Sequence, residues 1–434
     1  MSALDHALQL HGQGRLDEAR QAYLDILNAQ PSDDAAMHYL GILEHQCGRS
    51  EEGLDLLARA LDLGPPQADR LNDLGNVLSQ LERLDDAEAA FSAAEVLSPE
   101  DANLCNNLGS VLARLDRLRE AEAAFCRALA IDTGFVPALN NLGDLCTRQG
   151  RTDEAAQYHC QAFVSGPLDD KPKRMLGIAY YTLNRISEAA EVYRDWCAAE
   201  PHNPVARHLL AACSGQDVPA RAEDAFVEAI FDEYAENFDT KLVQSLAYRG
   251  PEYIAVALAK HLPAHGGLRV LDGGCGTGLC GPVLAPYAAH LTGVDLSANM
   301  LVRAETRGGY DKLVKAELGD YLASQDKTFD LIVIADVLIY FGALDGVLGA
   351  AAGALTGSGL LVFTVETQAA DPRSPPYVIK PSGRYRHAPQ YIERCLVQHG
   401  LRLLSSDAVV IREESTLPVA GLVVSAQRIV PLSA

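Results

Sequence analysis

The sequence predicts a multidomain chain in which an all-α region of repeated helix pairs precedes an α/β domain with a mostly parallel sheet. In the first half, small residues, large apolar residues and prolines recur at intervals of 34 residues, which is typical of stacked helix pairs. In the second half, short apolar runs that end in a glycine or an acidic residue alternate with helical segments, which indicates βαβ units. A length of 434 residues also exceeds what one core usually supports.

Six copies of the 34-residue unit follow one another without an insertion. One register holds only small residues, namely Ala7, Gly41, Gly75, Gly109, Gly143 and Gly177. Another holds mostly large side chains, such as Phe91 and Phe125, and proline ends most copies, as at Pro31 and Pro99. Small residues let two antiparallel helices approach closely, and proline ends the second helix because it has no N–H to donate to the preceding turn.

This pattern resembles the tetratricopeptide repeat, of which the segment Asn106–Phe125 is one helix pair. The resemblance implies a superhelix with a concave groove that usually binds a peptide or protein. We assign residues 1–214 to this domain, as six repeats and a capping helix that begins near His208, because a terminal repeat cannot bury a neighbour.

Side-chain amides recur in the repeats two and three residues before the glycine. The two registers are Asn72, Asn106 and Asn140, followed by Asp73, Asn107 and Asn141. An amide offers both a donor and an acceptor, so a row of them holds an extended peptide backbone. The arrangement resembles the asparagine ladder of the O-GlcNAc transferase repeats, and we predict that Asn72, Asn107 and Asn141 bind a partner or substrate. Alternatively, these amides cap helices or bond between repeats.

After Pro219 the 34-residue register is lost, and residues 215–245 form a predicted linker helix and cofactor lid. The helix is expected over 220–234. The aromatic and acidic string that follows resembles the segment ahead of many small methyltransferase domains, where an aromatic side chain closes over the cofactor. The resemblance makes Tyr234 and Phe238 lid candidates, although both residues would equally suit packing against the sheet.

A glycine-rich loop follows the first apolar run of the α/β domain. It begins at Asp272 and has glycines at Gly273, Gly274, Gly276 and Gly278. Glycines let the backbone approach a ligand and leave amides free at a helix start. The D-x-G-x-G-x-G pattern resembles the first motif of class I S-adenosylmethionine-dependent methyltransferases. A phosphate-binding Walker loop is excluded, because no Gly-Lys-Ser/Thr follows.

The second predicted strand ends at Asp295, 23 residues beyond Asp272. A carboxylate at this position accepts both ribose hydroxyls in a βαβ unit. The continuation through Leu296 and Met300 resembles the D-x-S-x-x-M-L pattern of the same superfamily, which implies that both contact the cofactor. The two motifs together favour S-adenosylmethionine over a nicotinamide cofactor. The resemblance places Asp272 at the amino-acid end of the cofactor, unless this side chain only caps the loop.

Two later segments fit the same template. The resemblance assigns adenine contact to Glu317 and Leu318, with Asp320 as the alternative acceptor. The fourth apolar run ends at Asp336, and Tyr340 follows it. Ligands of doubly wound sheets lie outside the carboxyl ends of strands, so we predict that Asp336 and Tyr340 are catalytic residues that meet the methyl donor and acceptor, with Asp336 also a candidate general base.

A polar, basic and aromatic segment, residues 377–387, follows the fifth predicted strand. The superfamily usually inserts substrate-recognition elements at this point. We predict substrate contact for Arg384, Tyr385 and His387, with His387 also as a general base, because arginine pairs with carboxylates and phosphates. The alternative is a loop whose arginines bind backbone carbonyls. The runs 401–411 and 418–429 close the sheet as an antiparallel pair, which gives seven strands within residues 246–434.

Composition argues against nucleic acid and membranes as partners. The net charge of −22 offers no basic stripe for nucleic acid, and no apolar run reaches the ~18 residues that cross a bilayer. The ten cysteines include no C-x-x-C pair, so neither a metal site nor disulfides are expected, and the start lacks a signal peptide, which favours the cytoplasm.

We therefore predict a methyltransferase whose repeats present a protein, peptide or carrier-bound acceptor. The alternative is a small-molecule methyltransferase whose repeats mediate protein interaction or self-association. The sequence does not specify the acceptor or the oligomeric state.

Overall fold

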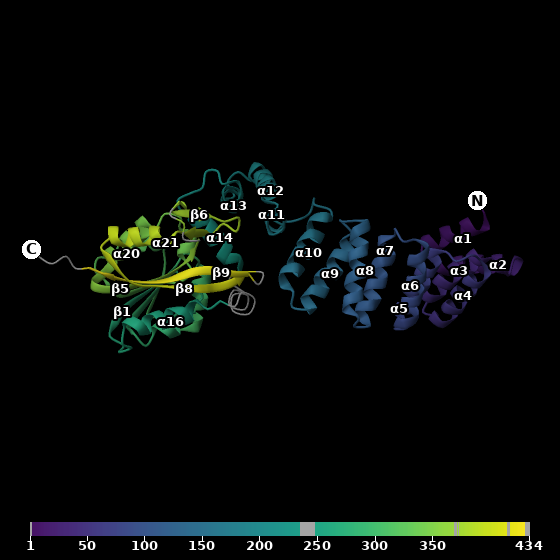
Figure 1. Ribbon diagram of the computed structural model, residues 1–434, viewed down its shortest axis with the longest axis horizontal. Coiled ribbons are helices and arrows are strands. Elements are labelled where there is room, and N and C mark those ends of the chain that lie inside the picture. Colours follow the sequence, from purple (N-terminus) through teal and green to yellow (C-terminus); the bar gives the residue numbers. More distant parts are fainter. Residues whose placement is uncertain (1, 235–247, 369–370, 372, 415–416, 430–434) are drawn as a thin grey trace, which may run out of the picture. The chain divides into compact units, whose positions relative to one another are not determined.

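The computed structural model describes residues 2–234, 248–368, 371, 373–414 and 417–429. Two compact units divide the chain, Met1–Asp170 and Lys171–Ala434. The first unit is all-α and the second combines helices with one sheet (Figure 1).

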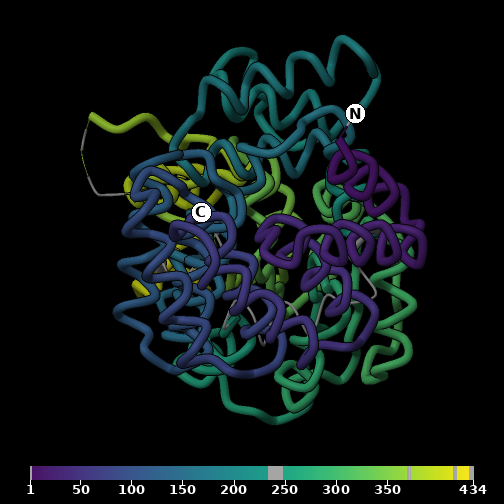
Figure 2. The backbone as a smooth tube through the Cα atoms, turned by 90° about the vertical axis from the view of Figure 1, so that its right-hand side faces the viewer, coloured from purple at the N-terminus to yellow at the C-terminus, as the bar shows by residue number. Residues whose placement is uncertain are grey.

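Five antiparallel helix pairs make up the first unit; Figure 1 labels them in succession, and Figure 2 shows their purple-to-blue coils end-on. The pairs are α1 (Ala3–Gly12) and α2 (Leu16–Ala29), α3 (Asp34–Gln46) and α4 (Ser50–Leu63), α5 (Ala68–Gln80) and α6 (Leu84–Leu97), α7 (Ala102–Arg114) and α8 (Leu118–Ile131), and α9 (Val136–Arg148) and α10 (Thr152–Ser165). The predicted helix pairs are thus present.

The small and large registers meet inside each pair. A Cβ atom on Gly75 would lie 2.7 Å from the Phe91 ring, and one on Gly109 would lie 2.6 Å from the Phe125 ring. Both rings are almost completely buried. Larger side chains do not fit at these glycines. Packing between the two helices of a pair therefore explains why a small residue recurs at this position of each 34-residue repeat.

The second unit begins with three further helices, α11 (Lys173–Thr182), α12 (Ile186–Ala199) and α13 (Pro204–Ser214). The side chain of Asn203 caps α13 by accepting hydrogen bonds from the amides of Val205 and Ala206, and Gly215 ends the helix in the left-handed conformation. Next come α14 (Asp224–Tyr234) and α16 (Gly250–His261).

Nine described strands form one sheet. They are β1 (Leu268–Gly273), β2 (Ala288–Asp295), β3 (Lys312–Lys315), β4 (Phe329–Ile334), β5 (Leu355–Thr367), β6 (Tyr377–Ile379), β7 (Tyr385–His387), β8 (Leu401–Glu414) and β9 (Leu417–Arg428). The path β3-β2-β1-β4-β5 is parallel, and β9 and β8 extend it antiparallel. This path of seven strands confirms the predicted class of sheet. The hairpin β6–β7 is an addition that pairs with the end of β5.

Helices cover both faces of the sheet. They are α17 (Gly281–Leu284), α18 (Ala298–Arg307), α19 (Leu318–Ala323), the short 3-10 helix η3 (Leu338–Tyr340), α20 (Asp345–Ala354) and α21 (Pro389–Gln398), together with α16. Alternate residues of β4 pack into different cores: Leu331 and Val333 into one, Ile332 and Ile334 into the other. Burial on both faces explains why this strand is apolar throughout.

Candidate cofactor and acceptor site

The glycine-rich loop connects β1 to α17 at the carboxyl edge of the sheet. The amides of Gly274 and Cys275 donate to the carbonyl of Val294 on β2, at 2.7 and 3.0 Å. Gly274, Gly276 and Gly278 all have positive φ, between 54° and 85°. A Cβ on Gly274 would meet Val337 at 2.2 Å, whereas the space beside Gly276 is open. The loop is therefore held closely against the strand ends and presents open backbone at Gly276.

Asp295 joins the end of β2 to this loop. One carboxylate oxygen accepts from the Gly276 amide at 2.8 Å and the other from the Ser297 amide at 2.9 Å. Burial raises the pKa of Asp295, while these backbone donors lower it. Each carboxylate oxygen has a second lone pair, so both oxygens of Asp295 retain the capacity to accept a further hydrogen bond.

Asp272 lies at the end of β1 and is only 1% exposed. The hydroxyl of Tyr310 donates to its carboxylate at 2.6 Å. Burial raises the pKa of Asp272 to about 7, against the lowering effect of the Tyr310 hydrogen bond. Sequence reasoning missed Tyr310, whose ring also lies within 3.1 Å of Cβ positions built on Gly278 and Gly281. Tyr310 therefore supports both the loop and Asp272.

The predicted adenine and ribose neighbours occupy helix starts. Met300 is buried, and its amide donates to Ser297, which caps α18. Leu296 is half-buried. Leu318 packs beneath Gly273, where a Cβ would lie 2.8 Å from its side chain. Glu317 caps α19 by accepting from the amide of the exposed Asp320 at 2.7 Å. The other Glu317 oxygen lies 3.5 Å from the guanidinium of Arg221, so both oxygens at this strand edge already have a partner.

The helix α14 contacts the same edge of the sheet. Its Glu228 accepts from Lys315 at 2.5 Å, and its Asp232 accepts from the Ser297 hydroxyl at 2.5 Å. The ring of Phe231 lies 5.7 Å from the ring of Tyr340. These contacts reach the ends of β2, β3 and β4. Of the two lid candidates, Tyr234 closes α14, where only its backbone is described, and Phe238 lies outside the described residues.

Asp336 follows β4 with a φ of +58°, in the left-handed region. Its amide donates to the hydroxyl of Thr364 at 2.8 Å, and its carboxylate accepts from Arg412 at 3.0 Å. The side chain is 18% exposed. Burial raises the pKa of Asp336, and the guanidinium groups of Arg412 and Arg384 lower it. Non-glycine residues rarely adopt this conformation, and such strain clusters at functional sites.

Arg412 is a second residue that sequence reasoning missed. It is 1% exposed and hydrogen bonds both Asp336 and Glu366, and Glu366 also accepts from Arg386 at 3.2 Å. Arg386 and Arg412 therefore pair with protein carboxylates. Arg384 is half-buried and acts electrostatically on both Asp336 and Tyr340.

Tyr385 and His387 of this hairpin pack in the interior and hydrogen bond to backbone carbonyls. Both are completely buried. The Tyr385 hydroxyl donates to the carbonyl of Pro219 at 2.7 Å, and Nε2 of His387 lies 2.7 Å from the carbonyl of Phe341. Burial lowers the pKa of His387 to about 4. A fully buried imidazole that donates to a carbonyl does not meet an acceptor, so we correct the predicted substrate contact of these two residues to a packing role.

The same hairpin receives α13. Nε2 of His208 lies 2.8 Å from the carbonyl of Gly383, and its ring lies 4.0 Å from that of Phe226. The carbonyl of Ala220 accepts from the amides of Gly342 and Ala343. The segment 377–387 thus fastens α13 and the start of the linker to the α/β domain.

The asparagine registers of the first unit bond between repeats. Asn107 donates to Asn72 and Asn141 donates to Asn106, each at 2.9 Å. Asn141 also lies 3.3 Å from the hydroxyl of Ser110. These contacts match the alternative stated for the amides, namely hydrogen bonds between neighbouring repeats. Each bond uses an N–H of the later asparagine and leaves its carbonyl oxygen outside the bond.

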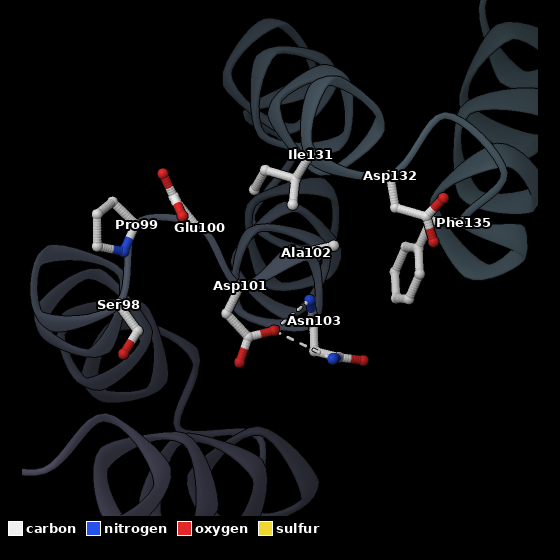
Figure 3. A pocket seen from close by; sticks show the side chains of 9 residues that line it. All are labelled: Ser98, Pro99, Glu100, Asp101, Ala102, Asn103, Ile131, Asp132 and Phe135. Atoms are coloured by element: carbon white, nitrogen blue, oxygen red, sulfur yellow. Dashed lines mark hydrogen bonds between the residues drawn. The ribbon is translucent and has the colours of Figure 1, made fainter.

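A cavity of about 660 Å³ lies elsewhere in the first unit, where the ends of α6 and α8 meet the starts of α7 and α9 (Figure 3). It is lined by Ser98, Pro99, Glu100, Asp101, Ala102, Asn103, Ile131, Asp132 and Phe135. Two of its carboxylates are engaged in turns: Asp101 accepts from the amide of Asn103 and Asp132 from that of Gly134. None of the predicted site residues lines this cavity.

No group of three or more metal-ligating side chains occurs among the described residues. In that same part of the chain, no helix is long and apolar enough to cross a membrane.

Comparisons with known proteins identify both parts of the chain. Residues 271–363 match the family model of a methyltransferase domain. Residues 4–68, 72–134 and 138–170 match models of the tetratricopeptide repeat. Human methyltransferase-like protein 27 is 38% identical over 112 residues, which cover 25% of this chain and 45% of that protein.

The ubiquinone biosynthesis O-methyltransferase of Xylella fastidiosa is 33% identical over 114 residues, 25% of this chain and 46% of that enzyme. The chain thus spans less than half the length of these two relatives. A solved S-adenosylmethionine-dependent methyltransferase from Mesorhizobium loti is 23% identical with a TM-score of 0.33, over 41% of this chain and all of that one. The matches confirm the predicted combination of repeats and methyltransferase domain, which implies S-adenosylmethionine as the cofactor.

Proposed function

We propose that this chain, in which tetratricopeptide repeats precede a methyltransferase domain, transfers a methyl group from S-adenosylmethionine to a protein, peptide or carrier-bound acceptor. The observation that carries the proposal is the glycine loop with three positive φ values, which is hydrogen bonded to Asp295 at the end of the neighbouring strand. Glycines in such a loop allow a ligand to approach the backbone closely. The carboxylate suits the two vicinal hydroxyls of a ribose.

The chain's residues fit the cofactor from end to end. Asp295 suits the ribose, Glu317 and Leu318 suit the adenine, and the open backbone at Gly276 suits the sulfonium half of the molecule. In this proposal Asp272 supports the loop at the amino-acid end from below, because its carboxylate is 1% exposed and accepts from Tyr310. Bound S-adenosylmethionine supplies an electrophilic methyl group.

The protein's contribution to such a transfer is alignment and exclusion of water, because charge is dispersed rather than created in the displacement. Asp336 sits at the end of β4 with part of its carboxylate exposed. It is placed to accept a hydrogen bond or proton from an acceptor nucleophile. Tyr340 is within electrostatic reach of Asp336, and its ring lies 5.7 Å from that of Phe231. His387 is not part of this proposal, since it is completely buried.

The repeats support a presented acceptor. The carbonyl oxygens of Asn107 and Asn141 lie outside the inter-repeat bonds and suit the N–H groups of an extended peptide. The second candidate is a small-molecule methyltransferase whose repeats serve protein interaction or self-association. It is favoured by the relative named for ubiquinone biosynthesis and by the use of the asparagine amides in bonds between repeats.

Cofactor binding is tested by isothermal calorimetry with S-adenosylmethionine on the full chain. We expect Asp295→Ala to weaken binding about tenfold or more, because charge-assisted hydrogen bonds contribute ~1.5–3 kcal/mol. Asp326→Ala is the matched control, since this exposed carboxylate precedes β4 at its amino end, away from the glycine loop. Equal affinity in Asp295→Ala and the native chain would overturn the ribose assignment.

The acceptor class is tested by incubating the full chain with methyl-labelled S-adenosylmethionine and extract of the source cells. Presentation by the repeats predicts label in macromolecules and a decrease in the double variant Asn107→Ala and Asn141→Ala. Asn103→Ala, an exposed amide bonded to Asp101, is the control. Label confined to small molecules and unaffected by the double variant would favour the second candidate.

A further inference from the structure

Two irregularities of the backbone meet at the pair formed by Asp336 and Arg412. Asp336 has a φ of +58° at the carboxyl end of β4. Arg412 stands on β8, where the pairing with β9 shifts register between Val410 and Arg412. A register shift of this kind redirects side chains and recurs beside active sites. The two irregular positions meet in one contact, the 3.0 Å hydrogen bond from Arg412 to Asp336.

The pair belongs to a buried ionic cluster. Arg412 is 1% exposed and lies between Asp336, at 3.0 Å, and Glu366, which is 3% exposed. Arg386 pairs with the other oxygen of Glu366 at 3.2 Å. Burying an arginine between two carboxylates is not a general route to stability, because packed apolar side chains serve equally well. The cluster leaves one exposed carboxylate edge, that of Asp336.

We propose that Arg412 is a positioning residue that keeps the Asp336 carboxylate ionised and fixed in direction toward the acceptor, so that the acceptor atom is one that carries a proton, on nitrogen or oxygen. This inference rests on the proposed methyltransferase function. In the step, the electron pair of the nucleophile forms the bond to the methyl carbon while the carbon–sulfur bond breaks and its electrons stay on sulfur. The proton of the nucleophile passes to Asp336.

Other groups also act on Asp336. The guanidinium of Arg384, from the turn between β6 and β7, favours its ionised form, and Glu366 on β5 opposes it. The hydroxyls of Tyr340 and Tyr248 are within electrostatic reach of the carboxylate. Removal of Arg412 leaves Asp336 and Glu366 without their shared cation, so Asp336 takes up a proton at higher pH.

The direct test measures the titration of Asp336 without any acceptor. Aspartate carboxyl carbons are labelled with carbon-13 in the full chain, and the Asp336 signal is assigned by its loss in Asp336→Asn. In Arg412→Met we expect its midpoint to rise by about one pH unit or more. Arg412→Lys restores most of the native midpoint. Arg402→Met, on the same strand but hydrogen bonded to Gln427, leaves it unchanged.

A second variant, expected to shift the Asp336 midpoint in the opposite direction, keeps the test valid if Arg412→Met does not fold. Glu366→Gln removes a negative neighbour and lowers the Asp336 midpoint. S-adenosylmethionine affinity, measured by calorimetry, stays native in Arg402→Met and Arg412→Lys, because the first lies outside the cluster and the second keeps its cation. An unchanged midpoint in both Arg412→Met and Glu366→Gln would overturn the inference.

The second readout is the pH profile of label transfer into cell extract. In Arg412→Met the acid limb moves to higher pH by the same interval as the Asp336 midpoint, and Arg412→Lys restores it. A shifted midpoint with an unshifted acid limb would show that the pair is only structural and would overturn the positioning role. Absence of transfer by the native chain would instead count against the proposed function, while the titration would still decide on the pair.

Discussion

At Gly274 the backbone conformation and the surrounding space both demand glycine. The residue has a φ of +73°, and a Cβ would lie 2.2 Å from a Val337 methyl carbon. We expect Gly274→Ala to lower the free energy of unfolding by ~1–3 kcal/mol and to abolish measurable cofactor binding, because the loop must move away from β4. Urea unfolding and calorimetry measure the two effects.

Gly346 provides the matched control for that substitution. It is an exposed residue of α20 with nothing within 4 Å of its Cβ position. Gly346→Ala should leave cofactor affinity unchanged and stabilise the helix by up to ~1 kcal/mol. Equal effects of the two substitutions would mean that the loop at Gly274 is not held as described.

Burial of Asp272 makes stability depend on pH, and the hydrogen bond from Tyr310 moderates this dependence. The folded pKa of Asp272, about 7, lies above its ordinary value of 3.8, so the folded chain binds the extra proton. Asp272 therefore adds stability at low pH that is lost as pH rises from about 4 to about 7. Tyr310→Phe removes a donor to the carboxylate and raises this pKa further.

As pH rises from 6 to 8, the free energy of unfolding should fall by about 1 kcal/mol more in Tyr310→Phe than in the native chain, for a rise of about one unit in the Asp272 pKa. Urea unfolding at the two pH values measures the difference. In an Asp272→Asn background the same substitution should show no such pH dependence. A pH dependence that persists there would assign the effect to another group.

The residues that the sequence identified and those that it missed differ in their distance along the chain. Asp272, Gly276 and Asp295 belong to local patterns with fixed spacing, so the motifs indicated them. Tyr310 and Arg412 reach the site from 38 and 76 residues beyond their partners, and no local pattern marks such contacts. The sequence also carried no sign that His387 is buried, because its Nε2 bonds to the backbone carbonyl of Phe341 rather than to another side chain.

Among the elements, the hairpin β6–β7 illustrates what periodicity does not show. The long strands and the repeat helices were predicted, since apolar positions recur along them. Strands of three residues, Tyr377–Ile379 and Tyr385–His387, carry no recognisable period. Their polar composition suggested substrate contact, but they form the surface on which α13 docks through His208.

This docking yields a prediction for α13. His208 is 3% exposed, and its Nε2 bonds to the carbonyl of Gly383. His208→Ala leaves that carbonyl without its donor, at a cost of ~1–3 kcal/mol. We expect faster hydrogen exchange in α13 and in residues 377–387, with α1 to α10 unchanged. Arg207→Ala is the neighbouring control, because its pair with Glu223 is exposed and contributes little.

Protonation of His208 should act in the same direction. Burial lowers its pKa below the ordinary value of 6.5, so the neutral imidazole is the form that the docked helix favours. The docking is fully present above pH 6.5 and weakens as pH falls below it. The protection factors of the α13 amides, which are corrected for the intrinsic pH dependence of exchange, should therefore fall below pH 6.5 in the native chain and stay constant there in His208→Ala.

At the scale of the whole molecule, the 34-residue register runs without interruption to Pro201, yet the compact units divide after Asp170. The register reports packing inside a helix pair, and it does not report where one cooperative unit ends. The sixth helix pair, α11 and α12, therefore belongs to the same compact unit as the methyltransferase domain. That assignment required the structure.

Two compact units predict two thermal transitions with different responses. Phe125 is buried in the first unit, where its ring fills the space opposite Gly109. Phe125→Ala should destabilise the transition of this unit by ~3–5 kcal/mol, because it removes buried surface and leaves a cavity. S-adenosylmethionine at 100 times its Kd should raise only the other transition, by ~2.7 kcal/mol of stabilisation, since the ligand binds the folded second unit alone. Differential scanning calorimetry of the full chain measures both. A single transition that responds to the substitution and to the ligand alike would mean that the repeats and the methyltransferase domain unfold as one cooperative unit.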